Sequence, residues 1–279
     1  MIIKKKNLDL ESIKSSEFLS NLDLSKKNLS NLDLSEKNFS GSDLNSCDLR
    51  KSNLRKCDFS GTSMIGVKLE NANLDYVDLS DAGLSDSNLS QVSLNNANVS
   101  QALLRNVIFS NSDITNTDLS NALLIFSNFT SANLTKSILK NSFCANANFT
   151  NANLTDTKMD YADFFEANFS GTTLKNASLE NANLSNSNFS DANLNYANLK
   201  GAFLGNANFT NSTLIHSNMV GADLKDANMT SSDLSHVDLS SSLLYNTNFT
   251  NAILKNTNLK DSDLTGQNID DLKDKGAII

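Results

Sequence analysis

Proline is absent from this chain of 279 residues, and glycine is scarce, with 10 residues. Proline has no N–H to donate to a β-ladder, so its absence is typical of a backbone whose ladder is unbroken. The scarcity of glycine indicates turns that do not depend on it. No hydrophobic run approaches the ~20 residues of a membrane span. The segment before Phe18 has a run of lysines at positions 4–6 but no apolar core of a signal peptide, so we expect a cytoplasmic protein.

Cysteine and histidine are also rare, at three and two residues. Cys47, Cys57 and Cys144 occupy positions that the repeat described below directs inward, so we interpret them as small buried hydrophobic residues. His216 and His236 are twenty residues apart, and the nearby sequence supplies no third ligand. Two ligands make a poor metal site, so we predict no metal and no cofactor.

An apolar residue returns at every fifth position, without interruption, from Leu19 to Ile269; Cys144 alone among these residues is not Leu, Phe, Ile, Met or Val. A small residue stands two places before most of them. A period of five fits neither a strand nor a helix over a long run. It fits a short extended segment, in which these two positions point inward, followed by a corner.

Phenylalanine shows how many pentads complete one coil. From Phe109 to Phe209 a phenylalanine recurs every twenty residues, and Phe39 and Phe59 have the same spacing. A superperiod of twenty means four pentads per coil, so that like residues stack in columns, and stacked rings gain stability beyond their area burial. The pattern therefore predicts a coil of square section with one pentad on each side.

Triplets of a small residue, Asn or Asp, and an apolar residue carry a resemblance to a known family. Examples are Ala152-Asn153-Leu154, Ala192-Asn193-Leu194 and Ala227-Asn228-Met229. The chain resembles the pentapeptide-repeat family over roughly residues 19–269. The resemblance implies an all-β fold, a right-handed quadrilateral β-helix of about 13 coils with short terminal caps.

We expect three parts: an N-terminal cap over residues 1–18, the pentapeptide-repeat β-helix over 19–269, and a C-terminal helical cap over 270–279. Caps are needed because an open coil exposes core and unpaired ladder. Leu10, Ile13 and Phe18 are predicted to form one face of the first cap. Lys27 and Lys37 occupy inward positions, so we expect an irregular first coil.

The net charge is −8, and it is unevenly distributed. Residues 1–70 carry 12 basic and 10 acidic side chains, whereas residues 71–279 carry 11 and 21. This distribution disfavours nucleic-acid binding along the whole repeat. The resemblance extends to bacterial proteins that protect DNA gyrase by mimicking DNA, and a gyrase- or topoisomerase-binding role is therefore an alternative function.

Several apolar residues stand at outward positions on the same predicted side of the coil. Leu103, Leu123 and Phe143 follow one another at a spacing of twenty. Contiguous exposed apolar residues on a soluble protein indicate a contact surface, although corner side chains that bury one another would give the same pattern. The candidate partner-binding residues are Leu103, Leu123, Ile125, Phe126, Phe143 and Phe165, and Phe203, Leu243 and Tyr245 continue that side.

Catalysis has little support, because the sequence contains neither a phosphate-binding glycine loop nor a nucleophile–histidine–acid set. Asp160 and Asp163 are the nearest candidates for a carboxylate pair of the kind used by β-helical enzymes that cleave sugars. A column of Thr and Ser, including Thr130 and Thr150, leaves ice binding as a further alternative. The sequence favours a non-catalytic scaffold that presents flat faces to a protein partner, or to a second copy in a homodimer.

Overall fold

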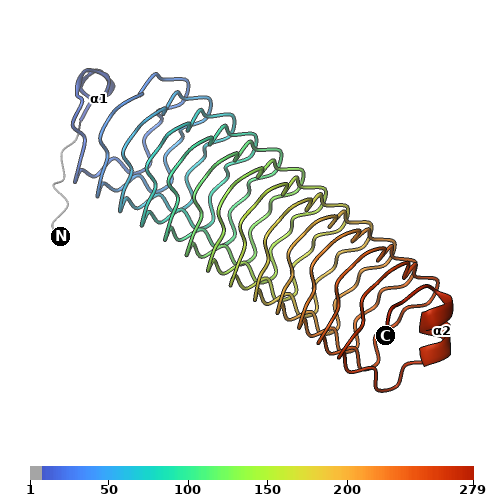
Figure 1. Cartoon of the computed structure of the whole chain (residues 1–279). Coiled ribbons are helices and arrows are strands. Elements are labelled where there is room, and N and C mark those ends of the chain that lie inside the picture. The colour runs from blue at the N-terminus through green and yellow to red at the C-terminus, as the bar shows by residue number, and fades with distance from the viewer. Residues whose placement is uncertain (1–7) are drawn as a thin grey trace. The chain divides into compact units, whose positions relative to one another are not determined.

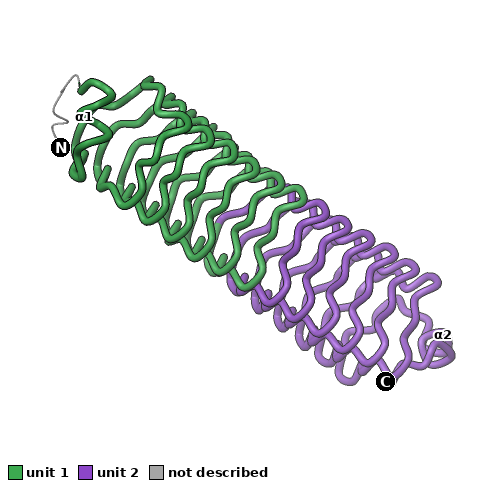
Figure 2. Tube along the Cα trace, turned by 90° about the horizontal axis from the view of Figure 1, so that it is seen from above, with its two compact units in different colours: residues 1–142 green, residues 143–279 purple. Residues whose placement is uncertain are grey.

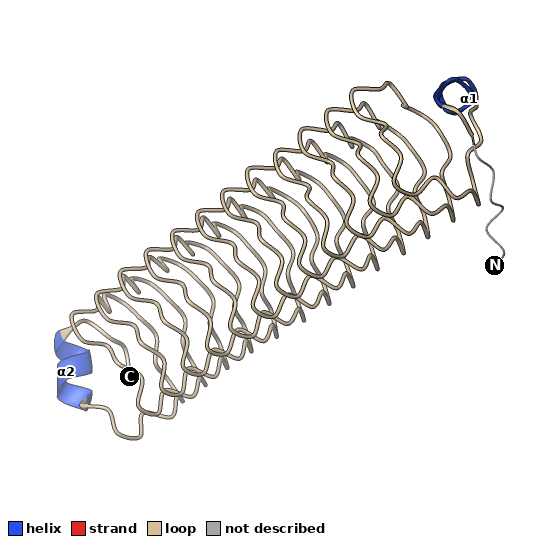
Figure 3. Cartoon of the chain, turned by 180° about the vertical axis from the view of Figure 1, so that it is seen from behind, coloured by secondary structure: helices blue, strands red, loops and turns tan. Residues whose placement is uncertain are grey.

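The computed structural model describes residues 8–279 and divides the chain into two compact units, residues 1–142 and 143–279 (Figure 2). In each unit the backbone winds in stacked coils (Figure 1). Within residues 8–279 the two terminal helices, α1 and α2, are the only regular elements of more than one residue, and the rest of the described chain is drawn as loop in Figure 3.

Neighbouring coils are joined by single-residue parallel β-bridges, and every bridge connects residues twenty apart. Leu103 pairs with Leu123 in the first unit, and Asn188 pairs with Asn208 in the second. This register confirms four pentads per coil. Because each extended segment is so short, the bridges do not merge into longer strands, and stability comes from their repetition along the stack.

The repeat supplies an acceptor for all five backbone N–H groups of a pentad. Three N–H groups bond to carbonyls of the coils above and below, one closes the corner as a turn, and one bonds to a side chain. In the pentad Asp43–Cys47 the acceptors, in chain order, are Leu22 O (2.9 Å), Ser63 O (2.7 Å), Asp43 Oδ1 (2.9 Å), Ile65 O (2.9 Å) and Leu44 O (3.0 Å). Asn and Asp dominate the position before the buried apolar residue because their side-chain oxygen accepts the one N–H of the pentad that has no backbone carbonyl as its acceptor.

Each corner contains a residue in the left-handed region, with φ near +60°. These residues have numbers ending in 1 or 6, and asparagine is the most frequent among them. Asparagine tolerates this conformation better than other non-glycine residues, which explains how the chain turns so many corners with so few glycines. A bulky residue here, such as Phe126 (φ 61°), is unusual.

The core consists of the inward columns that the sequence predicts. The apolar residue of every pentad from Leu19 to Leu259 is buried. Phe149, Phe169, Phe189 and Phe209 form a continuous stack in the second unit, with ring centroids 4.8–5.0 Å apart. In the first unit Phe39–Phe59 and Phe109–Phe129 stack at 4.9 Å. The coil spacing therefore brings the rings to an offset-stacked distance.

Helix α1 (Leu10–Ser15) lies beside the first coil (Figure 1). Asp9 caps it by accepting the Ser12 N–H at 2.8 Å, and Ile13 is its buried residue. The prediction that Leu10, Ile13 and Phe18 share one buried face is wrong for two of them. Leu10 is exposed, and Phe18 is 75% exposed, because Phe18 already occupies an outward ladder position and pairs with Asn38. Residues 1–7 of the predicted cap lie outside the described residues.

The first coil keeps the bridge register, but its corners depart from the regular pattern as predicted, since the Leu22 N–H bonds to Ser42 Oγ in place of a turn carbonyl. Leu19, Leu24 and Leu29 are fully buried, and the bridge register begins at Phe18. The two inward lysines are accommodated because their ammonium groups reach cap carbonyls. Lys37 Nζ donates to Lys14 O (2.8 Å) and Ser16 O (2.7 Å), and Lys27 Nζ donates to Leu8 O (2.9 Å). These lysines satisfy carbonyls of the cap while their aliphatic stems cover the end of the core.

Helix α2 (Ile269–Asp274) covers the last coil. Ile269, the last apolar residue of the period, is the first residue of this helix, and Leu272 is its buried side chain. Gly276 follows in a left-handed conformation (φ 95°), and the tail then returns to the ladder, where Ile278 pairs with Asn258. Among residues 8–279 no helix has the length and apolar character needed to cross a membrane.

The phenylalanine column predicts a large loss of stability from one substitution. Phe189→Ala removes a buried ring stacked on both Phe169 and Phe209 and leaves a cavity. We expect it to lower the free energy of unfolding by about 3–5 kcal/mol, as measured by denaturant unfolding. Phe203→Ala, which truncates an exposed ring, is the matched control and is expected to change stability little. Equal losses for the two variants would contradict the role of the column.

The cysteines of the first unit generate a second prediction. Burial raises the pKa of Cys47 to about 11 and that of Cys57 to about 12, and each thiol donates to a core carbonyl. Because the thiolate is the reactive form, both residues should resist iodoacetamide at pH 8 in the folded protein and react in guanidinium. Site-resolved mass spectrometry measures this difference. Rapid alkylation of Cys57 under native conditions would contradict the prediction.

Candidate protein-binding surface

Four of the predicted contact residues come together in the first unit. Leu103 and Leu123 pair across adjacent coils on one side, and Ile125 and Phe126 form the corner that ends this side. Leu103 is 51% exposed and Phe126 is 49% exposed, whereas Leu123 and Ile125 are half-buried. The surface therefore combines two exposed apolar side chains with two half-buried ones.

Two further residues complete this surface, and the apolar columns of the sequence did not predict them. Ile108 lies on the neighbouring side, is exposed, and pairs with Asn128, two residues after Phe126. The guanidinium of Arg105 lies over the Phe126 ring, 5.5 Å from its centroid. The signal for Ile108 was an isoleucine at a position where Asn and Asp predominate. We call this surface the apolar corner, made of Leu103, Arg105, Ile108, Leu123, Ile125 and Phe126.

Phe143 and Phe165 belong to the second unit, where they lie around Asp163. Phe143, 52% exposed, pairs with Asp163, and Phe165 follows it by two residues. Tyr161, which the sequence reasoning missed, is exposed two residues before Asp163. The Asp163 carboxylate accepts the Phe165 N–H (3.2 Å) and the Asn183 amide (2.8 Å). This second aromatic group is thus interrupted by a polar residue that is held in place.

The predicted continuation through Phe203 and Leu243 is not contiguous. Both residues are exposed, but Asp223 pairs with each of them and separates them by one coil. Lys225 lies over the Tyr245 ring at 5.8 Å. These residues are single exposed apolar side chains, which are common on soluble proteins.

The basic side chains of the early coils are engaged with neighbours. Arg50 makes two hydrogen bonds to Asp48, at 2.8 and 2.5 Å, and this contact lowers the pKa of the carboxyl. Lys56 pairs with Glu36 at 2.9 Å, and Arg55 lies over the Tyr76 ring. Contacts of this kind leave few cations of this group available to phosphates.

The carboxylates proposed for catalysis have structural partners instead. Asp160 is buried and accepts the Ser178 hydroxyl and the Glu180 N–H (3.2 Å). Asp163 holds the corner described above. Asp163 follows the pattern of the repeat, in which an Asp before the buried apolar residue accepts the N–H two residues later, whereas Asp160 follows the buried Met159 and accepts an N–H of the next coil. Both carboxylates thus act as hydrogen-bond acceptors for their neighbours in the coils.

The hydroxyl column and the histidine pair are ordered by the same spacing of twenty. Thr210 and Thr230 donate to Asn208 and Asn228 at 2.6 Å, so their hydroxyl groups are turned toward the ladder. His216 and His236 stack at 4.8 Å, and Tyr196 stacks on His216 at 5.1 Å. Within residues 8–279 no group of three or more His, Cys, Asp or Glu side chains is arranged to hold a metal ion.

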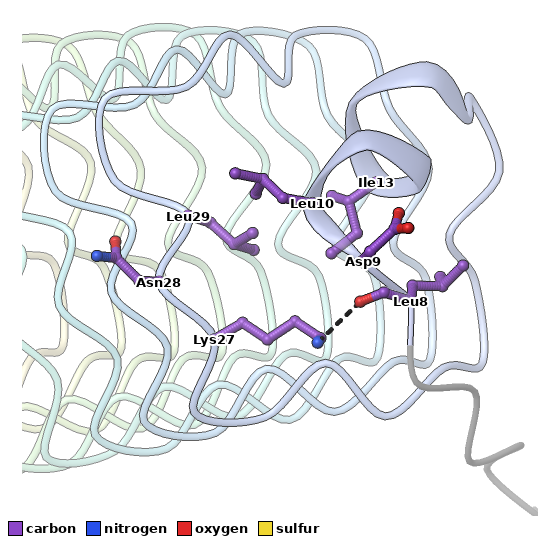
Figure 4. A pocket seen from close by; sticks show the side chains of 7 residues that line it. All are labelled: Leu8, Asp9, Leu10, Ile13, Lys27, Asn28 and Leu29. Atoms are coloured by element: carbon purple, nitrogen blue, oxygen red, sulfur yellow. Dashed lines mark hydrogen bonds between the residues drawn. The ribbon is translucent and has the colours of Figure 1, made fainter.

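A cavity of about 240 Å³ lies between α1 and the first coil, lined by residues that include Asp9, Ile13 and Lys27 (Figure 4). Its polar groups already have partners. Lys27 Nζ bonds to Leu8 O, and the Ser12 hydrogen bonds lower the pKa of Asp9, which caps α1. These interactions secure the cap, and the apolar corner is the stronger candidate for a functional site.

Comparison with solved structures supports the fold. HetL, a pentapeptide repeat protein involved in heterocyst differentiation regulation from the cyanobacterium Nostoc sp., is 29% identical, with 75% of this chain and 90% of HetL covered and a TM-score of 0.52. A trypsin-treated form of QnrB1, a plasmid-mediated fluoroquinolone resistance protein, is 14% identical over 83% of this chain and 98% of that one, with a TM-score of 0.36. A search of curated proteins finds no significant match.

The sequence pattern of a known family matches most of the chain. Pentapeptide repeats are found over residues 19–61, 52–91, 82–121, 127–164, 162–195, 192–230 and 232–266. These segments coincide with the coils described above, and the residue spacing of twenty between coils agrees with them. The chain belongs to the pentapeptide repeat family.

Proposed function

We propose that this protein is a non-catalytic scaffold that binds a protein partner through the apolar corner. The observation that carries the proposal is the replacement of the usual Asn or Asp by Leu103, Ile108 and Leu123 in neighbouring pentads of adjacent coils. Each replacement exposes apolar surface and also removes a side-chain acceptor from the corner. Exposed clusters of this kind on soluble proteins are typical of contact surfaces.

The composition of the apolar corner suits protein recognition. Aromatic and arginine side chains carry a large share of binding energy at interfaces, and here Arg105 is held over the Phe126 ring. The backbone beneath is fixed by ladder bonds, such as Leu103 N to Ala82 O (2.8 Å) and Leu123 N to Ala102 O (3.0 Å). A partner therefore loses little affinity to ordering of this surface.

A regulatory role for HetL agrees with a binding function for this chain. The gyrase-mimic alternative takes second place. It needs carboxylates presented outward, but many Asp side chains of residues 71–279 turn back to accept corner N–H groups. For example, Asp78 Oδ1 accepts the Ser80 N–H (2.9 Å), and Asp118 Oδ1 accepts the Ser120 N–H (2.9 Å). The same surface could instead join two copies of this chain, and the molecular mass in solution distinguishes such a homodimer from a monomer that binds another protein.

The double variant Leu103→Asn with Leu123→Asn tests the proposal without threatening the fold. Asparagine is the residue that the repeat prefers at these positions, and it supplies the missing corner acceptor. We expect the variant to fold at least as well as the wild type and to lose its partner. The measurement is capture of proteins from a cell extract by immobilised full-length protein, with light scattering to detect self-association.

Phe203→Asn with Leu243→Asn is the matched control, because it makes the same kind of change on isolated residues of the second unit. We expect this control to retain the captured protein. The proposal is overturned if the wild type and both variants retain the same proteins in the same amounts.

A further inference from the structure

The apolar corner borders a column of backbone N–H groups that lack the acceptor supplied elsewhere in the repeat. Ser85 and Arg105 occupy the same corner position in successive coils. The residue two places before Ser85 is Gly83 and the one two places before Arg105 is Leu103, and neither has a side-chain oxygen. Among the described residues no acceptor is recorded for the N–H of Ser85 or of Arg105. Leu123 likewise offers no side-chain oxygen to the N–H of Ile125, one coil further on.

Some other corners without the usual Asn or Asp recruit an acceptor from the previous coil, and this column does not. Ile65 N–H donates to Asn45 Oδ1 (2.7 Å), and Ile215 N–H donates to Asn195 Oδ1 (2.8 Å). In the column of Ser85, Arg105 and Ile125, the residue at the same position one coil earlier is an isoleucine, a serine or an arginine. The structure records no bond to that residue from the N–H of Ser85 or Arg105. The N–H groups of Ser85 and Arg105 therefore remain, in adjacent coils, as donors without a recorded protein acceptor, and rows of such donors can bind an anion.

Arg105 adds a cation at the centre of this column. Its guanidinium lies over Phe126, and within the part of the chain that the structure describes no ion pair to it is recorded. Asp86, which follows Ser85 in the previous coil, accepts the Asn106 amide at 2.9 Å. A guanidinium and backbone N–H groups are the donors that bind a carboxylate most strongly.

We propose that the partner presents a protein segment in which a carboxylate side chain adjoins apolar residues. The carboxylate is bound by the Arg105 guanidinium and the N–H groups of Ser85 and Arg105. The apolar residues pack on Leu103, Leu123 and Phe126. This inference rests on the proposed binding function and names the chemistry of the partner. A nucleic acid fits less well, because its phosphates would meet only one unpaired arginine at this surface and a chain of net charge −8.

The test uses the full-length protein and a random dodecapeptide library displayed on phage. We expect enriched peptides to contain Asp or Glu next to Leu, Ile, Val or Phe. One enriched peptide is then synthesised with a fluorescent label, together with its Glu→Gln or Asp→Asn form, and the Kd is measured by anisotropy. Loss of the charge in the peptide, or Arg105→Gln in the protein, should weaken binding about tenfold or more.

Gly83→Asn isolates the contribution of the backbone donors. A Cβ at Gly83 would meet Thr62 O at 3.9 Å, an ordinary contact, so the side chain fits and supplies an acceptor for the Ser85 N–H. We expect about threefold weaker binding of the acidic peptide and no change for the neutral form.

Three results would count against these ideas, and they differ. Enriched peptides without acidic residues, or binding unaffected by Arg105→Gln, would overturn the inference and leave the proposed function in place. Displacement of the peptide by an equal concentration of an oligodeoxynucleotide would overturn the choice of a protein segment. If the wild type enriches peptides no more than the Leu103→Asn, Leu123→Asn double variant does, the proposed function itself is overturned.

Discussion

The structure depends on one hydrogen bond that the backbone cannot make for itself. Ladder and turn bonds use four of the five N–H groups in a pentad, and the Oδ1 of an Asn or Asp accepts the fifth, as Asp43 does for Asn45. This requirement explains the dominance of Asn and Asp at one position of the repeat. It also gives the exceptions a meaning. A pentad that places Leu, Ile or Phe there gives up a structural bond for an exposed apolar side chain, and in the apolar corner three such pentads are neighbours.

The regular part of the fold follows from the sequence because its determinants are local and repeated. The spacing of Phe149, Phe169 and Phe189 predicts the twenty-residue register, and the structure stacks these rings at the distance between coils. The inward position of Cys47 and Cys57 follows from the period alone. In each case the side chain has one direction available, set by alternation along a short extended segment.

The ends and the outward surface were harder to predict, for physical reasons. Lys37 is inward by the period, and only the position of α1 shows that its ammonium group meets the Lys14 and Ser16 carbonyls. The sequence predicts Phe18 as a residue of the N-terminal cap, but it forms a bridge of the ladder with Asn38. On the surface, Ile108 and Tyr161 were missed because exposure depends on the residues one coil away, not on the period. The unpaired N–H groups of Ser85 and Arg105 become visible only when the acceptor of every corner amide has been identified.

The bridge register also bears on how the chain acquires this structure. Every bridge closes a loop of about twenty residues, so the entropic cost of adding each coil is small and nearly constant. Growth does not have to wait for a distant segment of the chain. Helix α1 and the first coil, joined through Lys27 and Lys37, are synthesised before the later coils. A polypeptide built in this way is suited to fold during synthesis, with each new coil using the preceding one as its template.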